Sequence, residues 1–189
     1  MNISDRARKS VAFLGIKKGG KFLPRATAFF VQCIEDQHRF DHLVTAEHVI
    51  SGLLAKNHKI WLRVNLVGGN AKEFPMDGAL FTFHPNSELE PTDVAVTPIN
   101  TVLADEETGE TLRIDVAPLL LHVPSTFIPT EQFAKESIVL GGEIAIIGLF
   151  RSHYGANRIV PIVRVGNISA LLDEPIFTKY VGHIAAYLV

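Results

Sequence analysis

Apolar residues along this chain gather in short runs of strand length, and glycine-containing or charged turns separate the runs. The run 11–16 ends at Lys17-Lys18-Gly19-Gly20, and the run 26–34 ends at a polar segment, 35–38. Runs of the same kind follow at 40–45, 60–67, 79–83, 93–96, 138–140, 144–148, 158–165, 169–172 and 183–189. Because β-branched residues are frequent in these runs and turns come at short spacing, the pattern predicts an all-β barrel or sandwich.

One segment, 46–56, has the spacing of a helix instead of a strand. Its apolar side chains occupy positions i, i+1, i+4 and i+5, namely Val49, Ile50, Leu53 and Leu54. This spacing places them on one face of a short helix, for which Thr45 is a suitable N-cap. The pattern therefore predicts a strand, 40–45, that leads directly into a helix.

The composition changes between residues 100 and 115, where acidic residues and glycine replace the apolar runs. This segment holds Asp105, Glu106, Glu107, Gly109 and Glu110. Such a stretch is typical of a connection between two folded units. We predict one unit over residues 1–105 and a second unit over residues 106–189.

The overall composition fits a globular protein and limits its partners. Of the 189 residues, 47% are hydrophobic and 20% are charged, which is enough apolar material for a folded core. The formal net charge is −2, so no general attraction to nucleic acid or to an anionic membrane is expected. A basic cluster near the N-terminus lacks an accompanying aromatic pattern and is expected to be solvated: Arg6, Arg8, Lys9, Lys17, Lys18 and Lys21.

Cys33 is the single cysteine, so the fold is expected to be stable without an intrachain disulfide. Residues 1–10 are mostly polar and charged, and they lack the apolar centre of a signal peptide. The apolar runs are all shorter than a membrane span. Together these features predict a cytoplasmic protein that does not enter a membrane.

Two short motifs resemble the catalytic segments of trypsin-like serine peptidases. The first is Thr45-Ala46-Glu47-His48, which follows an apolar strand and opens the predicted helix. The second is Pro91-Thr92-Asp93-Val94-Ala95-Val96, which we expect to be a strand buried on both faces with the carboxylate at its start. His48 precedes Asp93 by 45 residues (93 − 48), and this order is that of the family. Val49 stands where many secreted members have a cysteine, so the chain is more similar to compact bacterial members without disulfides.

The resemblance covers most of the chain and implies both a fold and a function. It implies two β-barrels of the six-stranded type, with the barrel in 1–105 complete and the barrel in 106–189 incomplete. It also implies an endopeptidase that hydrolyses peptide bonds in protein or peptide substrates, with no cofactor and no metal ion. In such an enzyme His48 is the general base that takes the proton of a serine, and Asp93 fixes the imidazole tautomer and stabilises its cation.

The nucleophilic serine of that triad has no counterpart within residues 1–189. The family places it in a Gly-x-Ser-Gly segment, whose backbone N–H groups form the oxyanion hole, and this sequence contains no such segment. Ser169, in Gly166-Asn167-Ile168-Ser169, resembles instead the strand that precedes the active-site loop. We therefore expect the nucleophile beyond Val189, and we expect residues 1–189 alone to be inactive.

Other reactive residues have simpler explanations. Cys33 lies in a first-barrel strand, whereas viral cysteine peptidases of this fold have their nucleophile late in the sequence, so we expect a buried core thiol. His38 and His42 are expected on a turn and a strand, where their spacing does not bring them to one face for a metal ion. Gly68-Gly69 and Gly141-Gly142 lack the Lys-Ser/Thr of a phosphate-binding loop and are expected in turns.

Two other functions stay open. A non-catalytic member of the fold would bind a protein partner through its barrel surface, and an incomplete second barrel would expose strand edges that promote self-association. An unrelated ligand-binding barrel would place His48 and Asp93 far apart. The distance between these two side chains therefore separates the last alternative from the others.

Overall fold

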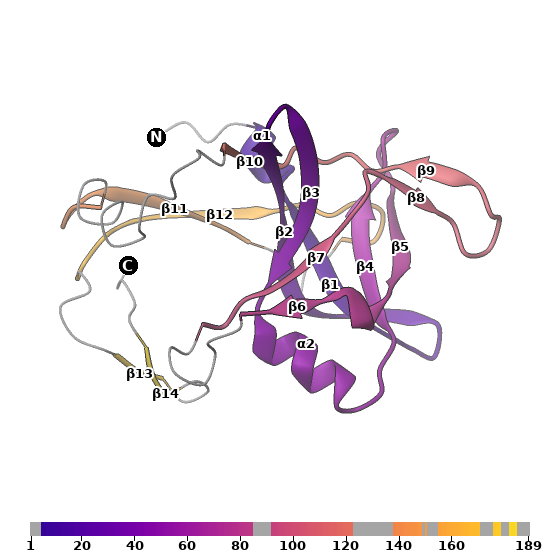
Figure 1. Ribbon diagram of the computed structural model, residues 1–189, viewed down its shortest axis with the longest axis horizontal. Coiled ribbons are helices and arrows are strands. Elements are labelled where there is room, and N and C mark those ends of the chain that lie inside the picture. Colours follow the sequence, from indigo (N-terminus) through magenta and orange to yellow (C-terminus); the bar gives the residue numbers. More distant parts are fainter. Residues whose placement is uncertain are drawn as a thin grey trace.

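The structure is a computed structural model, and it describes residues 5–84, 92–122, 138–148, 150, 155–170, 176–178 and 182–184. Strands dominate, so the expected all-β class is confirmed (Figure 1). The helices are α1 (Asp5–Arg8), α2 (Glu47–Leu54) and the 3-10 helix η1 (Gly78–Leu80). The strands are β1 (Val11–Lys18), β2 (Lys21–Glu35), β3 (His38–Thr45), β4 (Ile60–Asn65), β5 (Ala71–Met76), β6 (Thr82–Phe83), β7 (Ala95–Pro98), β8 (Val102–Ala104), β9 (Thr111–Arg113), β10 (Leu119–His122), β11 (Glu143–Gly148), β12 (Ile162–Asn167), β13 (Ile176–Thr178) and β14 (Gly182–Ile184).

One main sheet of eight strands carries the first two thirds of the chain. Its order is β5-β4-β1-β2-β3-β7-β6, and β10 pairs with β2 in parallel, at residues 31–34. The strands β5 and β6 lie at opposite ends of this order, yet residues 77–81 join them directly in the sequence. Among the described residues no pairing links β5 to β6, so closure into a six-stranded barrel stays a prediction.

The inner face of the main sheet packs around one core. Ala12 and Leu14 of β1, on alternate positions, are fully buried in it. α2 lies along one end of the sheet (Figure 1) and adds Ile50 and Leu53, which belong to the apolar helix face that the sequence predicts. Each fully buried leucine or isoleucine side chain stabilises the fold by about 1.5–3 kcal/mol.

β1 and β4 are buried on their outer faces as well. Phe13 points away from the main core, is 1% exposed, and packs with Phe22 and Ile159. A continuous apolar run such as 11–16 is typical of a strand that is covered on both sides. The cover on the outer face comes from residues 155–159, which are distant in the sequence.

Several segments differ from the predicted elements, among them 138–140, which is not a strand. Residues 71–76 form β5, which the sequence does not predict because Lys72, Glu73 and Pro75 interrupt the apolar pattern. Within the expected strand 79–83, η1 takes the first residues and only Thr82–Phe83 pair as β6. β12 begins at Ile162 and not at 158, because the residues before it bond to the main sheet.

The expectation that residues 93–96 form a strand buried on both faces is wrong. β7 begins at Ala95, and Ala95 and Thr97 are fully buried against the core. On the opposite face Val96 is half-buried, and Val94, just before the strand, is 36% exposed. Alternating burial is that of a strand with one face on a core.

The acidic segment that we expected to be a linker contains a β-hairpin. β8 pairs with β9 across the turn 105–110, and Ile114, directly after β9, is 3% exposed in the core of the main sheet. Ion pairs from Lys59 to Glu106 and from Lys72 to Asp105 hold the hairpin to the sheet. This part of the connection belongs with the main sheet, while the division into units 1–105 and 106–189 stays a prediction.

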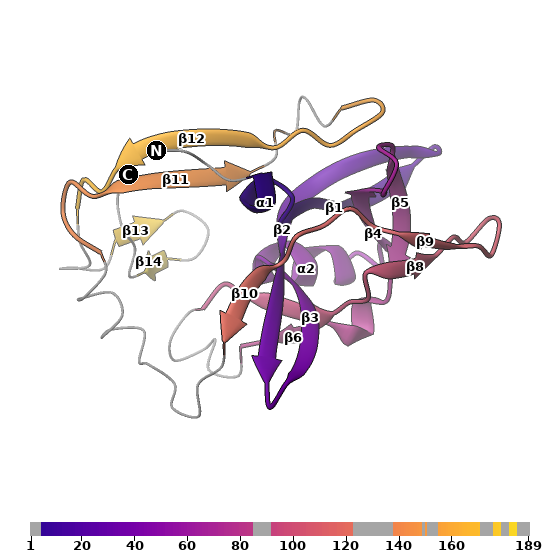
Figure 2. The same cartoon turned by 90° about the horizontal axis from the view of Figure 1, so that it is seen from above.

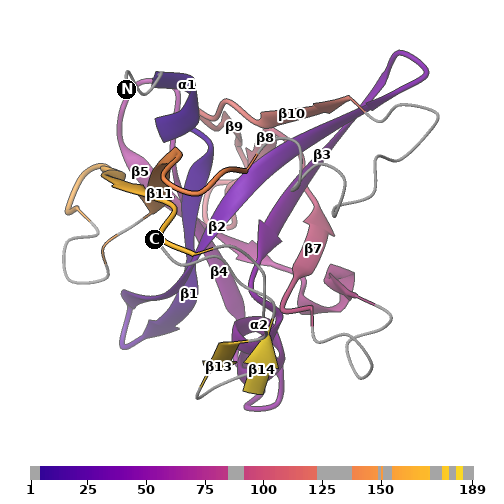
Figure 3. The same cartoon turned by 90° about the vertical axis from the view of Figure 1, so that its left-hand side faces the viewer.

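Beyond residue 137, the described strands form two separate ribbons. β11 pairs with β12 and β13 pairs with β14, both antiparallel. The β11–β12 ribbon projects away from the main sheet (Figure 2), and β13–β14 lies on the same side of the sheet, which faces the viewer in Figure 3. These ribbons do not form a closed barrel, so the second barrel stays a prediction. In the described ranges no helix is long and apolar enough to cross a membrane.

Candidate active site

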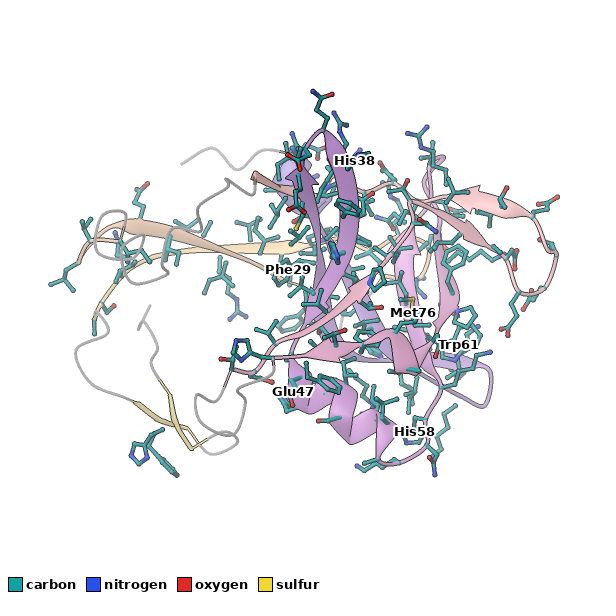
Figure 4. The ribbon with its side chains drawn as sticks, in the orientation of Figure 1. Phe29, His38, Glu47, His58, Trp61 and Met76 are labelled. Carbon is teal, nitrogen blue, oxygen red and sulfur yellow. The ribbon has the colours of Figure 1, made fainter. Side chains whose placement is uncertain are left out.

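His48 is held where a strand turns into a helix. β3 ends at Thr45, whose hydroxyl donates a hydrogen bond of 3.0 Å to the Thr27 carbonyl in β2. Thr45 is buried, so this bond fixes the end of the strand. One extended residue, Ala46, leads into α2, and His48 lies in the first turn of that helix. Glu47, the neighbour of His48, is labelled at this end of α2 in Figure 4.

Asp93 reaches His48 because of the register of two paired strands. β7 pairs with β3, and Ala95 lies opposite Thr45. Asp93 is two residues before Ala95, so it stands beside the chain as it leaves β3 for the helix. Two residues that are 45 positions apart in the sequence therefore meet at one end of the sheet.

The carboxylate of Asp93 contacts His48 with both of its oxygens. Oδ1 accepts a hydrogen bond of 2.9 Å from the His48 backbone N–H. Oδ2 lies 2.7 Å from Nδ1 of the imidazole ring. The two hydrogen bonds fix the ring relative to its own backbone, and the pair is within the range of a short, charge-assisted hydrogen bond.

This contact determines which ring nitrogen can act as a base. An ionised carboxylate only accepts hydrogen bonds, so Nδ1 carries the hydrogen when the ring is neutral. The lone pair is then on Nε2, at the other side of the ring. The His48 side chain is 55% exposed and the Asp93 side chain 29%. An incoming group can therefore reach the ring, while the carboxylate is more covered.

The sequence-based assignment of the N-cap is wrong. Ala46 occupies that position and makes no side-chain capping bond, and the Thr45 hydroxyl is bonded to Thr27 instead. The backbone N–H of His48, in the first turn, has no partner within the helix. The carboxylate of Asp93, which lies outside the helix, accepts its hydrogen bond. Alanine at an N-cap is a poor capping residue, but the sequence carries no signal for a distant acceptor because the adjacent Thr45 is itself a good capping residue.

No nucleophile accompanies the pair in the described part of the chain. The serines described there are Ser10, Ser51 and Ser169. Each hydroxyl donates to a backbone carbonyl within four residues of it, and none bonds to His48. Ser169 is exposed beside β12. The other serines of the chain (Ser4, Ser87, Ser125, Ser137 and Ser152) lie outside the described residues.

Cys33 is a free, half-buried thiol in β2, opposite Phe40 of β3. The expectation of a fully buried core thiol is wrong, because this part of the hairpin projects beyond the core and Phe40 is 49% exposed. Cys33 makes no hydrogen bond with His48, which follows the opposite end of β3. Cys33 is therefore not paired with the proposed base His48.

The two histidines that we considered as metal ligands do lie on one face, contrary to expectation. His38 and His42 both belong to β3, and residues four apart on a strand point to the same side. Four strand residues span about 13 Å, which is too far for one metal ion. Within the described ranges, no group of three or more His, Cys, Asp or Glu side chains could hold a metal ion.

A second charged pair joins the β8–β9 hairpin to β5. The Lys72 ammonium donates a hydrogen bond to Asp105, and the Glu107 backbone N–H donates a second. These bonds, the first above all, lower the pKa of Asp105 from 3.8 to about 2. Asp105 is buried in the turn, so this ion pair holds the hairpin in place and is not part of the His48 site.

Comparison with known proteins supports the fold. No protein-family model and no curated protein matches this sequence. Among solved structures, the crystal structure of Deg5 is similar, with a TM-score of 0.53 and 16% sequence identity. The likeness covers 96% of this chain, and this chain spans 66% of the length of the Deg5 chain. At this identity the likeness concerns the fold alone, and that fold is the all-β, trypsin-like one.

Proposed function

We propose that this chain carries the general base and the orienting carboxylate of a trypsin-like serine endopeptidase. His48 is the base and Asp93 is its partner. The observation that supports the proposal is the double contact of the Asp93 carboxylate, at 2.9 Å to the His48 backbone N–H and at 2.7 Å to Nδ1. A contact to the backbone alone would only cap the helix, whereas the second oxygen also sets the ring tautomer.

Each residue then has a defined role in peptide-bond hydrolysis. Nε2 of His48 takes the proton of a serine hydroxyl as the oxygen attacks the scissile carbonyl, and it later gives that proton to the leaving amine. The carboxylate of Asp93 stabilises the imidazolium that forms between these steps. This chemistry requires no metal ion and no cofactor, and the substrate is a protein or peptide.

The nucleophile is proposed to lie outside residues 1–189, in a Gly-x-Ser-Gly segment after Val189. No such segment occurs in the sequence, and the chain spans only part of the similar Deg5 chain. That segment would also supply the N–H groups of the oxyanion hole. We also propose that residues 106–189 are part of a second barrel, which continues beyond Val189. Because the chain has a single cysteine, and therefore no intrachain disulfide, we propose a cytoplasmic location.

Hydrolysis of an unfolded protein substrate by a gene product that continues past residue 189 tests this function. The His48→Ala and Asp93→Ala variants should each lose activity by about 10³–10⁴-fold or more, because the triad acts as a unit. Glu47→Gln, next to His48 but with no hydrogen bond or ion pair to Asp93, is the matched control and should keep its activity. Equal activity in His48→Ala and in the unchanged protein would refute the proposal.

A second candidate is a non-catalytic module that binds a protein or a second copy of itself. The β11–β12 ribbon favours it, because Ile146 is 50% exposed and Val165 is 61% exposed in the described structure. Apolar side chains on an unpaired ribbon promote association. If the complete protein shows no hydrolysis, and if Ile146→Lys abolishes its self-association or partner binding, this candidate replaces the first.

A further inference from the structure

Residues 155–159 precede β12 and lie against the outer face of the main sheet, over β1, β4 and β5. We call residues 155–159 the docking segment. Figure 2 shows the connection before β12 reaching the side of the sheet where β1 and β5 lie. We call the surface beneath it the docking face, made of Phe13, Phe22, Arg63, Asn65 and Ala71.

Arg63 of β4 holds the first two residues of the docking segment. Its guanidinium donates hydrogen bonds of 2.6 Å to the Gly155 carbonyl and 3.1 Å to the Ala156 carbonyl. Glu73, its cross-strand neighbour on β5, accepts a hydrogen bond of 3.0 Å from the same side chain. The Arg63 side chain is 8% exposed. A buried charge needs partners on several sides, and the docking segment supplies two of them.

Asn65 and Ala71 bind the rest of the segment through its backbone. The Asn65 side-chain amide donates to the Ile159 carbonyl at 3.0 Å, and its oxygen accepts from the Ile159 N–H at 2.8 Å. The Ala71 N–H donates to the Asn157 carbonyl at 2.6 Å. One amide side chain thus pairs with both backbone groups of a single residue. This mode of recognition uses the backbone of the segment and not a particular side chain.

One side chain of the segment is nonetheless recognised. Ile159 is 3% exposed and packs with Phe13 and Phe22, and Trp61 lies at the edge of the same cluster. The next residue, Val160, is 66% exposed. Two adjacent apolar residues of similar shape therefore differ completely in burial, which identifies Ile159 as the residue that the docking face receives.

Gly155 is required for the turn that presents the segment. Its φ is +73°, and a Cβ atom at this position would lie 1.8 Å from the Arg158 carbonyl oxygen. Both facts exclude other residue types. The backbone is thereby bent so that four of its carbonyls and one N–H bond to the sheet.

We propose that the docking face is a peptide-binding site of this protein. Its ligand class is a bent segment in which a turn at glycine is followed by a β-branched apolar side chain, and residues 155–159 fill it within the same chain. The docked segment attaches the chain just before β12 to the main sheet. The inference is independent of the proposed peptidase function, because it rests on contacts that do not include His48 or Asp93.

The first test uses the 189-residue chain and the variant Ile159→Asp, with Val160→Asp as the matched control. A carboxylate cannot enter the cluster of Phe13 and Phe22, so the segment should leave the docking face. Amide hydrogen exchange at Ala71 should become roughly tenfold faster or more in Ile159→Asp and stay unchanged in Val160→Asp. Emission from Trp61, the only tryptophan, should shift to longer wavelength in Ile159→Asp alone. Unchanged exchange and emission in Ile159→Asp would overturn the proposal.

The second test separates binding from folding. A synthetic peptide with the sequence of residues 155–161 is added to the Ile159→Asp chain. It should restore the Trp61 emission and the protection of Ala71 in a saturable manner, and a peptide with aspartate in place of isoleucine should not. An Asn65→Ala change in the same chain should weaken peptide binding by roughly tenfold, as expected for two lost hydrogen bonds, while Asn70→Ala should not. Failure of the first peptide to bind would show that the contact is only a packing feature of the intact chain.

Discussion

Asp93 bonds to His48 twice, once through the backbone N–H at 2.9 Å and once through Nδ1 at 2.7 Å. The same carboxylate therefore caps the start of α2 and orients the ring. Its position depends on the pairing of β7 with β3, in which Ala95 lies opposite Thr45. Stability and chemistry at this end of the sheet consequently share one side chain, and they can be separated by mutation.

Removal of the Asp93 carboxylate should destabilise the protein more than removal of the His48 ring. Asp93→Ala takes away the acceptor of a first-turn N–H and should lower the free energy of unfolding by about 1 kcal/mol. His48→Ala keeps that N–H and its hydrogen bond, so its effect should be clearly smaller. Urea denaturation of both variants measures the difference. A His48→Ala variant that is as unstable as Asp93→Ala would contradict the capping role.

The tautomer of the His48 ring should also depend on Asp93. In alkaline solution, ¹⁵N chemical shifts of the ring should show the hydrogen on Nδ1 and the lone pair on Nε2. The Asp93→Ala variant should lose this preference, because no carboxylate then accepts from Nδ1. Ring shifts that do not respond to Asp93→Ala would mean that the 2.7 Å contact is not maintained in solution.

Asp105 should make the fold sensitive to acid in a defined window. Its pKa is lowered from 3.8 to about 2 by the Lys72 hydrogen bond and then by the Glu107 N–H. Between these values the unfolded chain binds more protons than the folded one, so stability rises with pH. The contribution is complete above pH 3.8 and is lost as the pH falls through about 2.

The Asp105→Asn variant removes this titration. Its free energy of unfolding, measured by urea denaturation between pH 2 and pH 5, should change less steeply with pH than that of the unchanged protein. Asp77→Asn, which alters an exposed acid on another turn, serves as the control. Identical slopes for Asp105→Asn and the unchanged protein would show that the ion pair with Lys72 does not form.

Alanine substitution at two glycines should change the free energy of unfolding in opposite directions. Gly15 lies at a register shift of β1, and a Cβ there would lie 2.3 Å from the Leu23 carbonyl oxygen. Gly15→Ala should therefore cost about 1–3 kcal/mol of stability through overpacking. Gly52 lies inside α2 with open space around it, so Gly52→Ala should stabilise the protein by about 0.5–1 kcal/mol. Thermal or urea denaturation measures both changes in stability. If both variants were more stable than the unchanged protein, the packing described at Gly15 would be contradicted.

Local patterns in the sequence were sufficient for the elements that bury apolar residues regularly. The run 11–16 predicts β1, and the spacing of Val49, Ile50, Leu53 and Leu54 predicts α2. The pattern fails at β5, where Pro75 and charged residues lie in a strand that is paired on only one side in the described sheet. Residues 71–76 form a strand because they pair with β4, and this pairing cannot be read from the local sequence.

The candidate site was found for a different reason, namely the order and spacing of two short motifs. His48 and Asp93 could be named from the sequence, but the cap on α2 could not, because it comes from a residue 45 positions away. The docking segment was missed for the same reason. Ile159 and Val160 are apolar enough to continue a strand, and only the bonds of Ile159 to Asn65 of the main sheet determine that they do not.

The most direct measurement on the central proposal is active-site labelling of the protein as its natural source produces it. A fluorophosphonate reagent reacts with serines that an adjacent base activates, and mass spectrometry of the digest locates the labelled residue. We expect an intact mass greater than that of residues 1–189, and one labelled serine in a Gly-x-Ser-Gly segment after Val189. That label should be lost in His48→Ala. An intact mass equal to that of residues 1–189, with no labelled serine, would contradict the peptidase account.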